Sequence, residues 1–229
     1  NRLDLSIYKV QPFDWPAFKE YLQEYQRTDK TITPPGELVL DETMRIEAAT
    51  DTLTEVEIDL DEVMGGDFGH YIVIAKPPKG LFEEDRYWEA VQVWVQITSI
   101  GIDAFVDHSE LVVWLNELSN GKPITETSVQ SDSGRNLGST NDQGILRFDI
   151  PPEGIDFLVT QRGDDISFLP PSTYYWGDEG WSSRPIVDEL RWYVFDDRQM
   201  YRPGEAVHLK GWIRQVGMTQ EGDVSLLRN

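Results

Sequence analysis

Few side chains in this sequence could do catalytic chemistry. The 229 residues contain three histidines, His70, His108 and His208, and no cysteine. A hydrolase of the triad type needs a histidine paired with a serine or cysteine nucleophile, and no nucleophile motif accompanies any of the three. Without cysteine, this stretch of chain also has no disulfide, Cys-ligated zinc, iron–sulfur cluster or thioester. We therefore predict no enzyme activity, no catalytic residue and no cofactor.

Carboxylates are abundant enough to raise the question of a metal site. Within Glu55–Asp61 every second residue is acidic, and Glu62 follows. Carboxylates two residues apart on one strand lie about 7 Å apart, which is too far to hold one Ca²⁺ without ligands from a loop. The turn at 141–144, Asn-Asp-Gln-Gly, lacks the spaced carboxylates of an EF-hand. We interpret the acids as a solvated face that protects a strand, and we predict no metal site.

The net charge argues against several classes of partner. Lys and Arg total 20 against 41 Asp and Glu, which gives a net charge of −21. A charge of this sign repels phosphate, so we expect no nucleic-acid binding and no attraction to anionic membranes. The longest apolar runs, Tyr71–Ala75 and Leu111–Leu115, are far shorter than the roughly 20 residues that cross a bilayer as a helix. Because the sequence begins with Asn1 and enters a strand pattern almost at once, we expect a piece of a longer protein.

A group of aromatic residues is the main candidate for a contact surface. Tyr174, Tyr175, Trp176 and Trp181 lie near acidic residues in an irregular stretch. Rings on such a loop could stack on sugar rings, as they do in carbohydrate-binding modules. Large rings with a polar group are also favoured where two domains bury a seam. We favour the interdomain contact and keep the ligand contact as the alternative.

The elements that would position these residues are mostly strands. Leu3–Val10 has a strand pattern, and Asp14 followed by Pro16 is typical of a helix start. Apolar residues recur at helical spacing in 18–25, which predicts one amphipathic helix over about 15–27. The period then changes to two, and strands separated by turn residues are expected at about 55–61, 70–76, 91–99, 111–118, 127–131, 145–150, 157–161, 190–195, 207–213 and 224–227.

This strand pattern predicts the fold class. Short strands with a turn signal about every 8–12 residues are typical of antiparallel sandwiches. We therefore predict an all-β fold of tandem β-sandwich domains, with one helix inserted in the first. The polar stretch Glu83–Arg86 would link a sandwich at 1–86 to a second at 91–188. The segment 190–229 cannot close a sandwich alone, because two or three strands are marginal in water.

The last segment contains the most specific motif. Tyr201–Glu205, Tyr-Arg-Pro-Gly-Glu, is a tight turn between strands, in which Pro203 fixes φ and Gly204 supplies the positive φ of a type II turn. The wider string over 193–214, YVFDDRQMYRPGEAVHLKGWIR, resembles the start of a macroglobulin domain in the bacterial alpha-2-macroglobulin family. It departs from the family pattern at Asp196, where Thr is usual, and at Gln199, where Pro is usual. The resemblance gives a structural role to Asp197, Arg198, Tyr201, Arg202, Pro203, Gly204, Glu205, Lys210 and Gly211.

A second stretch carries the same resemblance. Thr98–Ile102, Val113–Ile124, Thr140–Gly144 and Gly163–Asp165 match, in this order, the preceding domain of bacterial macroglobulins. The resemblance covers about residues 92–215, whereas 1–86 match loosely as one more such domain. It implies that 190–229 are the truncated start of a third macroglobulin domain, whose strand edges would pair with another chain or with the second domain.

The resemblance implies a large multidomain protease inhibitor built from fibronectin-like sandwiches. Family members present a bait segment to a protease, rearrange when it is cut, and often capture the attacker through a Cys–Gln thioester. The cysteine is missing and a bait segment lies further along such chains, so the resemblance implies a non-catalytic scaffold here. Its partners would be neighbouring domains of the parent chain and, through the whole protein, target proteases, in a periplasmic, envelope-anchored or extracellular location. The alternative is a carbohydrate-binding or adhesin-type β-sandwich module.

Overall fold

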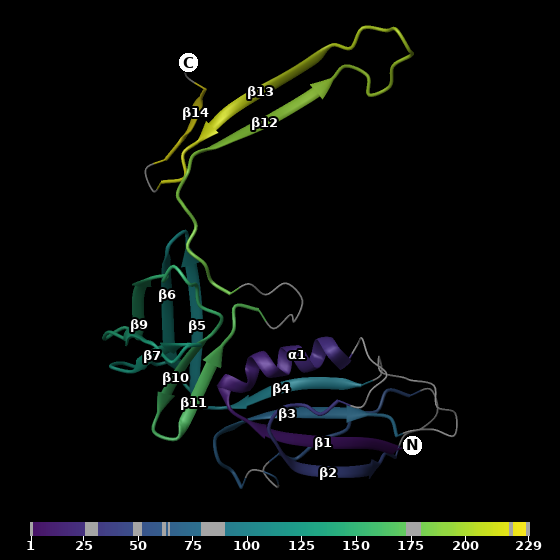
Figure 1. Ribbon diagram of the computed structural model, residues 1–229, viewed down its shortest axis with the longest axis vertical. Coiled ribbons are helices and arrows are strands. Elements are labelled where there is room, and N and C mark those ends of the chain that lie inside the picture. Colours follow the sequence, from purple (N-terminus) through teal and green to yellow (C-terminus); the bar gives the residue numbers. More distant parts are fainter. Residues whose placement is uncertain are drawn as a thin grey trace. The chain divides into compact units, whose positions relative to one another are not determined.

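The computed structural model describes residues 2–25, 32–47, 52–60, 63, 65–78, 90–172, 180–219 and 222–227. In these residues the chain forms antiparallel sheets, accompanied by a 3-10 turn and an α-helix (Figure 1). The predicted all-β fold class is thereby confirmed. The chain divides into two compact units, Asn1–Ser183 and Arg184–Asn229, which we call unit 1 and unit 2.

The first sheet of unit 1 has four antiparallel strands in the order β2-β1-β3-β4. β1 and β3 confirm two predicted strands, whereas β2 is not predicted by the sequence pattern. β4 lies in the range assigned to the second sandwich, and it pairs with β3 along its whole length. The strand bounds are β1 (Arg2–Val10), β2 (Glu37–Arg45), β3 (Gly69–Lys76) and β4 (Val91–Ile97).

A 3-10 turn, η1 (Pro12–Asp14), leads into the helix α1 (Trp15–Tyr25). Asp14 ends this turn instead of preceding it. Its Oδ2 accepts a hydrogen bond from the Gln11 N–H at 2.8 Å. The N-cap is therefore Gln11, one turn before the position that the sequence predicts, and the Asp14 carboxylate satisfies the otherwise free N–H of Gln11.

The apolar stripe predicted for the helix is confirmed. Phe18 and Tyr21 are buried, and with Leu22 and Tyr25 they pack against residues of the first sheet. Figure 1 shows α1 lying beside β4 of this sheet, where Trp15 and Phe18 contact Trp94. The helix end expected near Arg27 lies outside the described residues.

Residues 52–60 are irregular, so the strand predicted there is wrong where the structure describes it. Ile58 and Leu60 nevertheless pack, with Val63, on the face of the first sheet opposite α1. A segment that covers a face of a sheet cannot reach the strand edges, where backbone groups are free to pair. The alternation of acidic and apolar residues therefore indicates which side chains are buried, and it does not indicate that the segment pairs with a neighbouring strand. The core below this segment consists of Leu5, Ile7, Tyr71 and Val73.

The second part of unit 1 is a β-sandwich of two sheets, β5-β6-β9 and β11-β10-β7-β8. β6, β7, β9 and β10 confirm predicted strands, whereas β5, β8 and β11 are not predicted. The bounds are β5 (Ile100–Asp107), β6 (Glu110–Glu117), β7 (Ser128–Ser131), β8 (Asn136–Ser139), β9 (Ile145–Asp149), β10 (Leu158–Arg162) and β11 (Asp165–Leu169). Both sheets contribute to a core of Ile100, Leu111, Val113, Leu115, Ile124, Val129, Leu146, Ile150, Ile155, Leu158 and Trp181.

The hairpin of β10 and β11 is covered on both faces. Leu158 belongs to the sandwich core, whereas Phe157 and Val159 on either side of it belong to a second core. That second core also contains Phe168 of β11 and residues of α1, β1 and β3. Unit 1 is therefore one compact body in which two cores share the hairpin as a common wall. The division into sandwiches at 1–86 and 91–188 stays a prediction.

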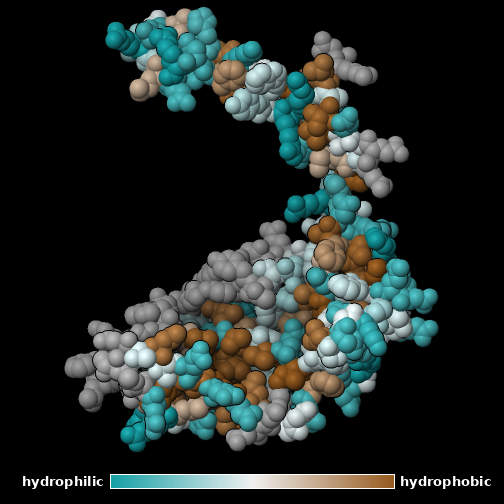
Figure 2. All heavy atoms as spheres, turned by 180° about the vertical axis from the view of Figure 1, so that it is seen from behind, coloured by the Kyte–Doolittle hydropathy of each residue, from teal (hydrophilic) through white to brown (hydrophobic). Residues whose placement is uncertain are grey.

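Unit 2 is a three-stranded antiparallel sheet in the order β12-β13-β14. Its strands, β12 (Glu189–Asp196), β13 (Leu209–Val216) and β14 (Val224–Leu226), confirm the three predicted at the end of the sequence. Large apolar side chains remain exposed, including Trp192 at 65% and Leu209 at 68%. Figure 2 shows the surface with residues coloured by hydropathy, and apolar residues reach it among hydrophilic ones. The assignment of this unit as a truncated third domain stays a prediction.

Candidate functional site

Aromatic rings join the first sheet, α1 and the β10–β11 hairpin. Trp15 of α1, Trp94 of β4 and Phe168 of β11 meet with ring centroids 5.2–5.6 Å apart. Phe18 lies 5.6 Å from Trp94, and Phe157 lies 5.9 Å from Phe168. Tilted and edge-on pairs of this kind are worth about 0.5–1.5 kcal/mol each beyond the area they bury. We call these five residues the aromatic joint.

His70 lies beside the aromatic joint and is 2% exposed. Its Nδ1 accepts a hydrogen bond from the Trp94 Nε1–H at 3.4 Å, so Nε2 carries the proton and donates to the Ile166 carbonyl at 3.0 Å. Burial lowers the pKa of His70, while the Ile166 carbonyl and the Asp165 charge act in the opposite direction. Both ring nitrogens are engaged, so the imidazole is a neutral bridge and not a general base.

Two polar side chains extend the joint along β11. The Gln96 amide brackets Phe168, donating to its carbonyl at 2.9 Å and accepting from its N–H at 3.0 Å. Asp165 is 3% exposed and accepts from the Ser99 N–H at 2.9 Å and from the Thr98 and Ser99 hydroxyls at 2.5 Å. Donors to a carboxylate form stronger hydrogen bonds than donors to a neutral group. The end of β4 and the chain after it are therefore fixed to β11.

An ion pair lies on the rim of the same region. Arg162 donates from Nη1 to Glu117 Oε1 at 2.5 Å and from Nη2 to the Ser99 hydroxyl at 3.1 Å. The hydrogen bond from Arg162 lowers the pKa of Glu117. Both side chains are partly exposed, so solvent screens their attraction.

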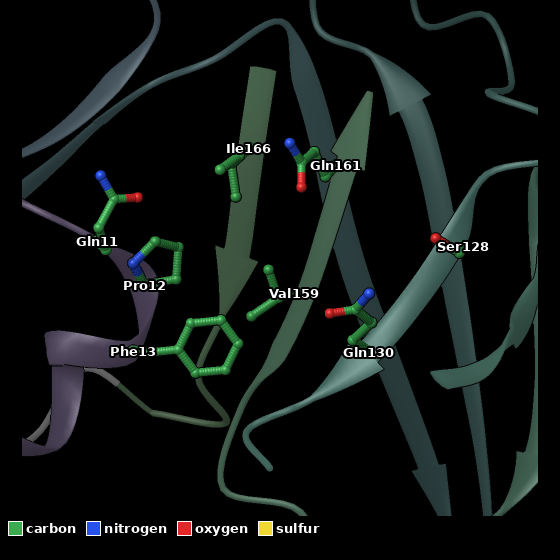
Figure 3. Close-up of a pocket in the computed structure, with 8 residues that line it drawn as sticks. All are labelled: Gln11, Pro12, Phe13, Ser128, Gln130, Val159, Gln161 and Ile166. Carbon is green, nitrogen blue, oxygen red and sulfur yellow. The ribbon is translucent and has the colours of Figure 1, made fainter. Parts of the chain in front are cut away.

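A small pocket lies where η1 approaches β7, β10 and β11 (Figure 3). Its volume is about 70 Å³. Phe13 at its rim contacts Phe157 of the aromatic joint, with ring centroids 5.8 Å apart. We call this cavity the amide pocket because three of its lining residues are glutamines, whose side chains end in a carboxamide. It is lined by Gln11, Pro12, Phe13, Ser128, Gln130, Val159, Gln161 and Ile166.

The family-motif residues lie in unit 2, mostly in the loop between β12 and β13. The Glu205 N–H donates to the Arg202 carbonyl at 3.1 Å, and Gly204 has a φ of 86°. With Pro203 before the glycine, this is the type II turn that the sequence predicts. The Glu205 carboxylate also accepts from the Arg202 N–H at 3.0 Å. The turn is therefore held by both the backbone and the side chain of Glu205.

A second set of contacts orders the start of this loop. The Tyr201 hydroxyl donates to the Asp197 carboxylate, and this hydrogen bond raises the pKa of Tyr201. The Arg198 guanidinium lies 5.1 Å from the centroid of the Tyr201 ring and 3.7 Å from Glu205 Oε2. These contacts are internal to the loop, and the structural role implied for the motif by the resemblance stays a prediction.

Gln199 occupies an uncommon backbone conformation. Its φ is 63°, and the Met200 N–H donates to the Arg198 carbonyl at 2.8 Å across it. A three-residue turn of this kind places its central residue at positive φ. Proline, which is usual at this position in the family pattern, has its φ fixed near −65° and cannot adopt this turn.

The two motif residues on β13 face opposite sides of the sheet. A Cβ on Gly211 would meet the Tyr193 carbonyl oxygen at 2.8 Å, so the close approach of β12 requires glycine. Lys210 lies with its Nζ 5.7 Å from the centroid of the Trp212 ring. Trp212 in turn stacks on Tyr193, with centroids 5.7 Å apart.

The aromatic residues proposed as a contact surface are described only at Trp181. Its ring is 9% exposed and belongs to the sandwich core. Its backbone pairs with Ile155 through hydrogen bonds of 2.8 and 2.9 Å. Little of this ring is left for an external ligand. Tyr174, Tyr175 and Trp176 lie outside the described residues, so the role of the group stays a prediction.

The remaining histidines lie in turns and loops. His108 Nδ1 is 2.6 Å from Asp107 Oδ1 between β5 and β6, and His208 is exposed just before β13. Among the described residues, no group of three or more His, Asp or Glu side chains could hold a metal ion. Within the same residues, no helix has both the length and the apolar character needed to cross a membrane.

Comparison with known protein sequences finds a distant relative. No family model matches the chain. The chain is similar to circularly permutated Ras protein 2 of Dictyostelium discoideum, with 23% identity over 272 residues. The match covers 93% of this chain, which spans only 7% of the length of that relative.

Solved structures of alpha-2-macroglobulin from Escherichia coli are similar in fold. Its NIE-MG1 fragment matches with 19% identity and a TM-score of 0.55, over 75% of this chain and 84% of that one. Its MG0-NIE-MG1 fragment matches with 18% identity and a TM-score of 0.54, over 75% and 55% of the chains. The trypsin-activated protein matches all of this chain over 17% of its own length, with 17% identity and a TM-score of 0.51. The resemblance predicted from the sequence is thereby confirmed at the level of structure, and the chain has the fold of the macroglobulin domains of a bacterial alpha-2-macroglobulin.

Proposed function

We propose that this chain is a non-catalytic scaffold segment of an alpha-2-macroglobulin-like protease inhibitor. The observation that supports the proposal most is the match of the whole chain, unit 2 included, to the trypsin-activated E. coli protein. A protease therefore acts on that relative, and the proposal extends this reaction to the whole protein of which our chain is a segment. The proposed partners are neighbouring domains and target proteases, in the periplasm, on the envelope or outside the cell.

The construction of unit 1 supports a mechanical role. The aromatic joint, the Gln96 bracket and the buried Asp165 connect its two cores through one hairpin. Such a body transmits displacement as a whole, because close-packed interiors are stiff. His70, the buried titratable group most suited to acid–base work, is engaged at both nitrogens. These features suit a domain that holds other domains in place.

We further propose that unit 2 is the first layer of a third sandwich. One face of its sheet carries Leu190, Trp192, Val194, Leu209 and Ile213 and becomes the core when a second layer covers it. The opposite face mixes the rings of Tyr193 and Trp212 with Arg191, Lys210 and Arg214. Burying the charged ends of these three side chains would be costly, so this face stays at a surface or seam.

The third-sandwich proposal is tested by chain length. Three proteins are compared: one ending at Ser183, the chain of 229 residues, and one extended by the next stretch of the parent. Dye binding to exposed apolar surface should rise from the first to the second and fall again in the third. Equal dye binding by the second and third proteins would contradict the proposal.

The inhibitor proposal is tested with the full-length protein and trypsin. A trapped protease keeps its active site but is shielded by bulk, so cleavage of a large protein substrate should be lost while cleavage of a small peptide substrate persists. Trypsin blocked at its active-site serine is the control and should leave the mobility of the full-length protein on a native gel unchanged. The chain of 229 residues alone should not inhibit.

Two outcomes would overturn the inhibitor proposal. One is full-length protein that neither reduces cleavage of the large substrate nor changes mobility after exposure to active trypsin. The other is inhibition of trypsin by the chain of 229 residues alone, which would place inhibitory activity within the segment and contradict a scaffold role.

A further inference from the structure

We infer that the amide pocket binds the acetamido group of an N-acetylhexosamine sugar. The inference concerns unit 1 alone and is independent of the proposed inhibitor role. Figure 3 shows the lining residues arriving from η1 on one side and from β7, β10 and β11 on the other. Segments more than 100 residues apart in the sequence thus form one concave surface.

The lining of the amide pocket selects an uncharged ligand. The chain has 41 acidic and 20 basic residues, yet none of the eight lining residues is ionisable. A charged group placed there would lose hydration without gaining an opposite charge, which is unfavourable. A neutral ligand that forms hydrogen bonds avoids this cost.

The polar groups of the lining match an amide. A carboxamide both donates and accepts hydrogen bonds, and a serine hydroxyl does so too. The Gln130 amide and the Ser128 hydroxyl both line the pocket, where they can form hydrogen bonds with a ligand. The Gln161 Nε2 donates to the Gly163 carbonyl at 2.8 Å, which leaves its Oε1 as an acceptor. An acetamido group supplies one N–H for such an acceptor and one carbonyl for such donors.

The size of the pocket fits the same group. A volume of 70 Å³ corresponds to roughly five water-sized atoms, and an acetamido group has about four non-hydrogen atoms. The apolar wall of Pro12, Val159 and Ile166 can receive its methyl group. In Figure 3 the Phe13 ring points towards Val159 and so borders this wall.

Phe13 distinguishes a sugar from a peptide amide. Its ring is 50% exposed and is fixed from behind by the contact with Phe157. An exposed ring held in position can stack on the apolar face of a sugar ring. A peptide ligand could place an asparagine or glutamine amide in the pocket, but these side chains have no ring that could stack on Phe13. The combination of an amide-lined pocket and an aromatic rim therefore favours an N-acetylhexosamine.

The test is a titration of the chain with a trimer of N-acetylglucosamine, followed by chemical shifts or heat. The matched ligand is cellotriose, which has the same linked rings with hydroxyls in place of the acetamido groups. We expect saturable binding of the acetylated trimer and at least about tenfold weaker binding of cellotriose. Phe13→Ala and Gln130→Ala should each weaken binding about tenfold, whereas Phe105→Ala, at a ring 57% exposed on β5, should not.

A second variant guards against loss of folding. Gln130→Leu keeps the volume of the side chain but removes its hydrogen bonds, so it should weaken binding while the melting temperature stays near that of the parent chain. Absence of saturable binding, equal binding of cellotriose, or binding that survives both Phe13→Ala and Gln130→Leu would overturn the inference. Tighter binding of an acetylated, asparagine-containing peptide would assign the pocket to a protein ligand instead. None of these results bears on the trypsin assay, so the two proposals fail separately.

Discussion

Unit 1 and unit 2 contain strands of similar apolar content but opposite burial. β3 has five consecutive buried residues, His70–Ile74, whereas β12 has seven exposed positions and one that is half-buried. β3 lies between α1 with the hairpin on one face and Ile58, Leu60 and Val63 on the other. The sheet of unit 2 leaves its large apolar side chains exposed. An apolar strand pattern thus predicts a sheet, but a second layer decides whether the sheet has a core.

The sharpest test of this comparison is a matched pair of phenylalanine substitutions. Phe168→Ala should reduce the free energy of unfolding by about 3–5 kcal/mol, because the ring is 2% exposed and its loss leaves a cavity among other rings. Phe195→Ala, at a ring 41% exposed in unit 2, should cost less than about 1.5 kcal/mol. Urea denaturation followed by circular dichroism measures both. A loss at Phe195 as large as that at Phe168 would show that unit 2 is covered in solution.

A smaller effect is expected from the buried carboxylate of the joint. Asp165→Asn should cost about 1.5–3 kcal/mol, because Thr98 and Ser99 would donate to a neutral group and one donor would face the new amide N–H. Asp164→Asn, at an exposed neighbour, should change stability by less than about 0.5 kcal/mol. Thermal melts of the two variants provide the comparison. Equal shifts of the melting temperature in the two variants would mean that the hydrogen bonds of Asp165 do not stabilise the fold.

His70 should make the stability of unit 1 depend on pH. Burial lowers its pKa below the ordinary value of about 6.5. Below that value the unfolded state binds a proton that the folded state does not, so stability decreases as pH falls towards the lowered pKa. The slope contributed is at most about 1.4 kcal/mol per pH unit.

The His70 prediction is checked by comparing stability from pH 7 to pH 5 in the parent chain and in His70→Gln, which removes the titrating ring. His208→Gln, at an exposed histidine of unit 2, is the matched control. The slope should become shallower in His70→Gln and stay unchanged in His208→Gln. Identical slopes in all three proteins would contradict the buried bridge.

The smallest expected effect is a backbone effect in unit 2. Gly204→Ala should destabilise the β12–β13 loop by about 1 kcal/mol, because Gly204 has a φ of 86°. A Cβ there would meet no atom within 4 Å, so the cost is conformational and not steric. Gly204→Asn should cost less, since asparagine tolerates positive φ. Amide hydrogen exchange at Glu205 measures the difference, and equal exchange in the two variants would contradict it.

Local patterns in the sequence predict elements better than they predict partners. The strand pattern at Leu3–Val10 and the helical stripe from Phe18 are local, and both are confirmed. β2 escapes prediction because an edge strand buries few side chains and therefore tolerates Asp41 and Glu42 within its apolar pattern. The alternation near Ile58 is equally clear but forms no ladder, because the segment covers a face of the sheet. The periodicity of apolar residues therefore indicates which side chains are buried, whereas the fold determines which segments pair as strands.

The candidate sites divide in the same way. The turn at Gly204 is predictable, because proline and glycine impose its backbone angles. The aromatic joint is not, because Trp15, Trp94 and Phe168 come from three separated segments that only packing brings together. The amide pocket is equally unpredictable from the sequence, because no local pattern around Gln161 indicates that this residue lies near η1.

The hairpin of β10 and β11 has consequences for how the molecule can change over time. A strand that is covered on one face only tolerates substitutions on its other face. In the hairpin, however, Leu158 and Val159 belong to different cores, so neither face is free to change. A substitution at either position must be compatible with its own core and with the position of a strand that the other core also fixes. Recombination that exchanged the first sheet and α1 alone would leave Phe157 and Phe168 facing a surface to which they are not matched. The first sheet with α1 and the β-sandwich of unit 1 should therefore be inherited, lost and exchanged together.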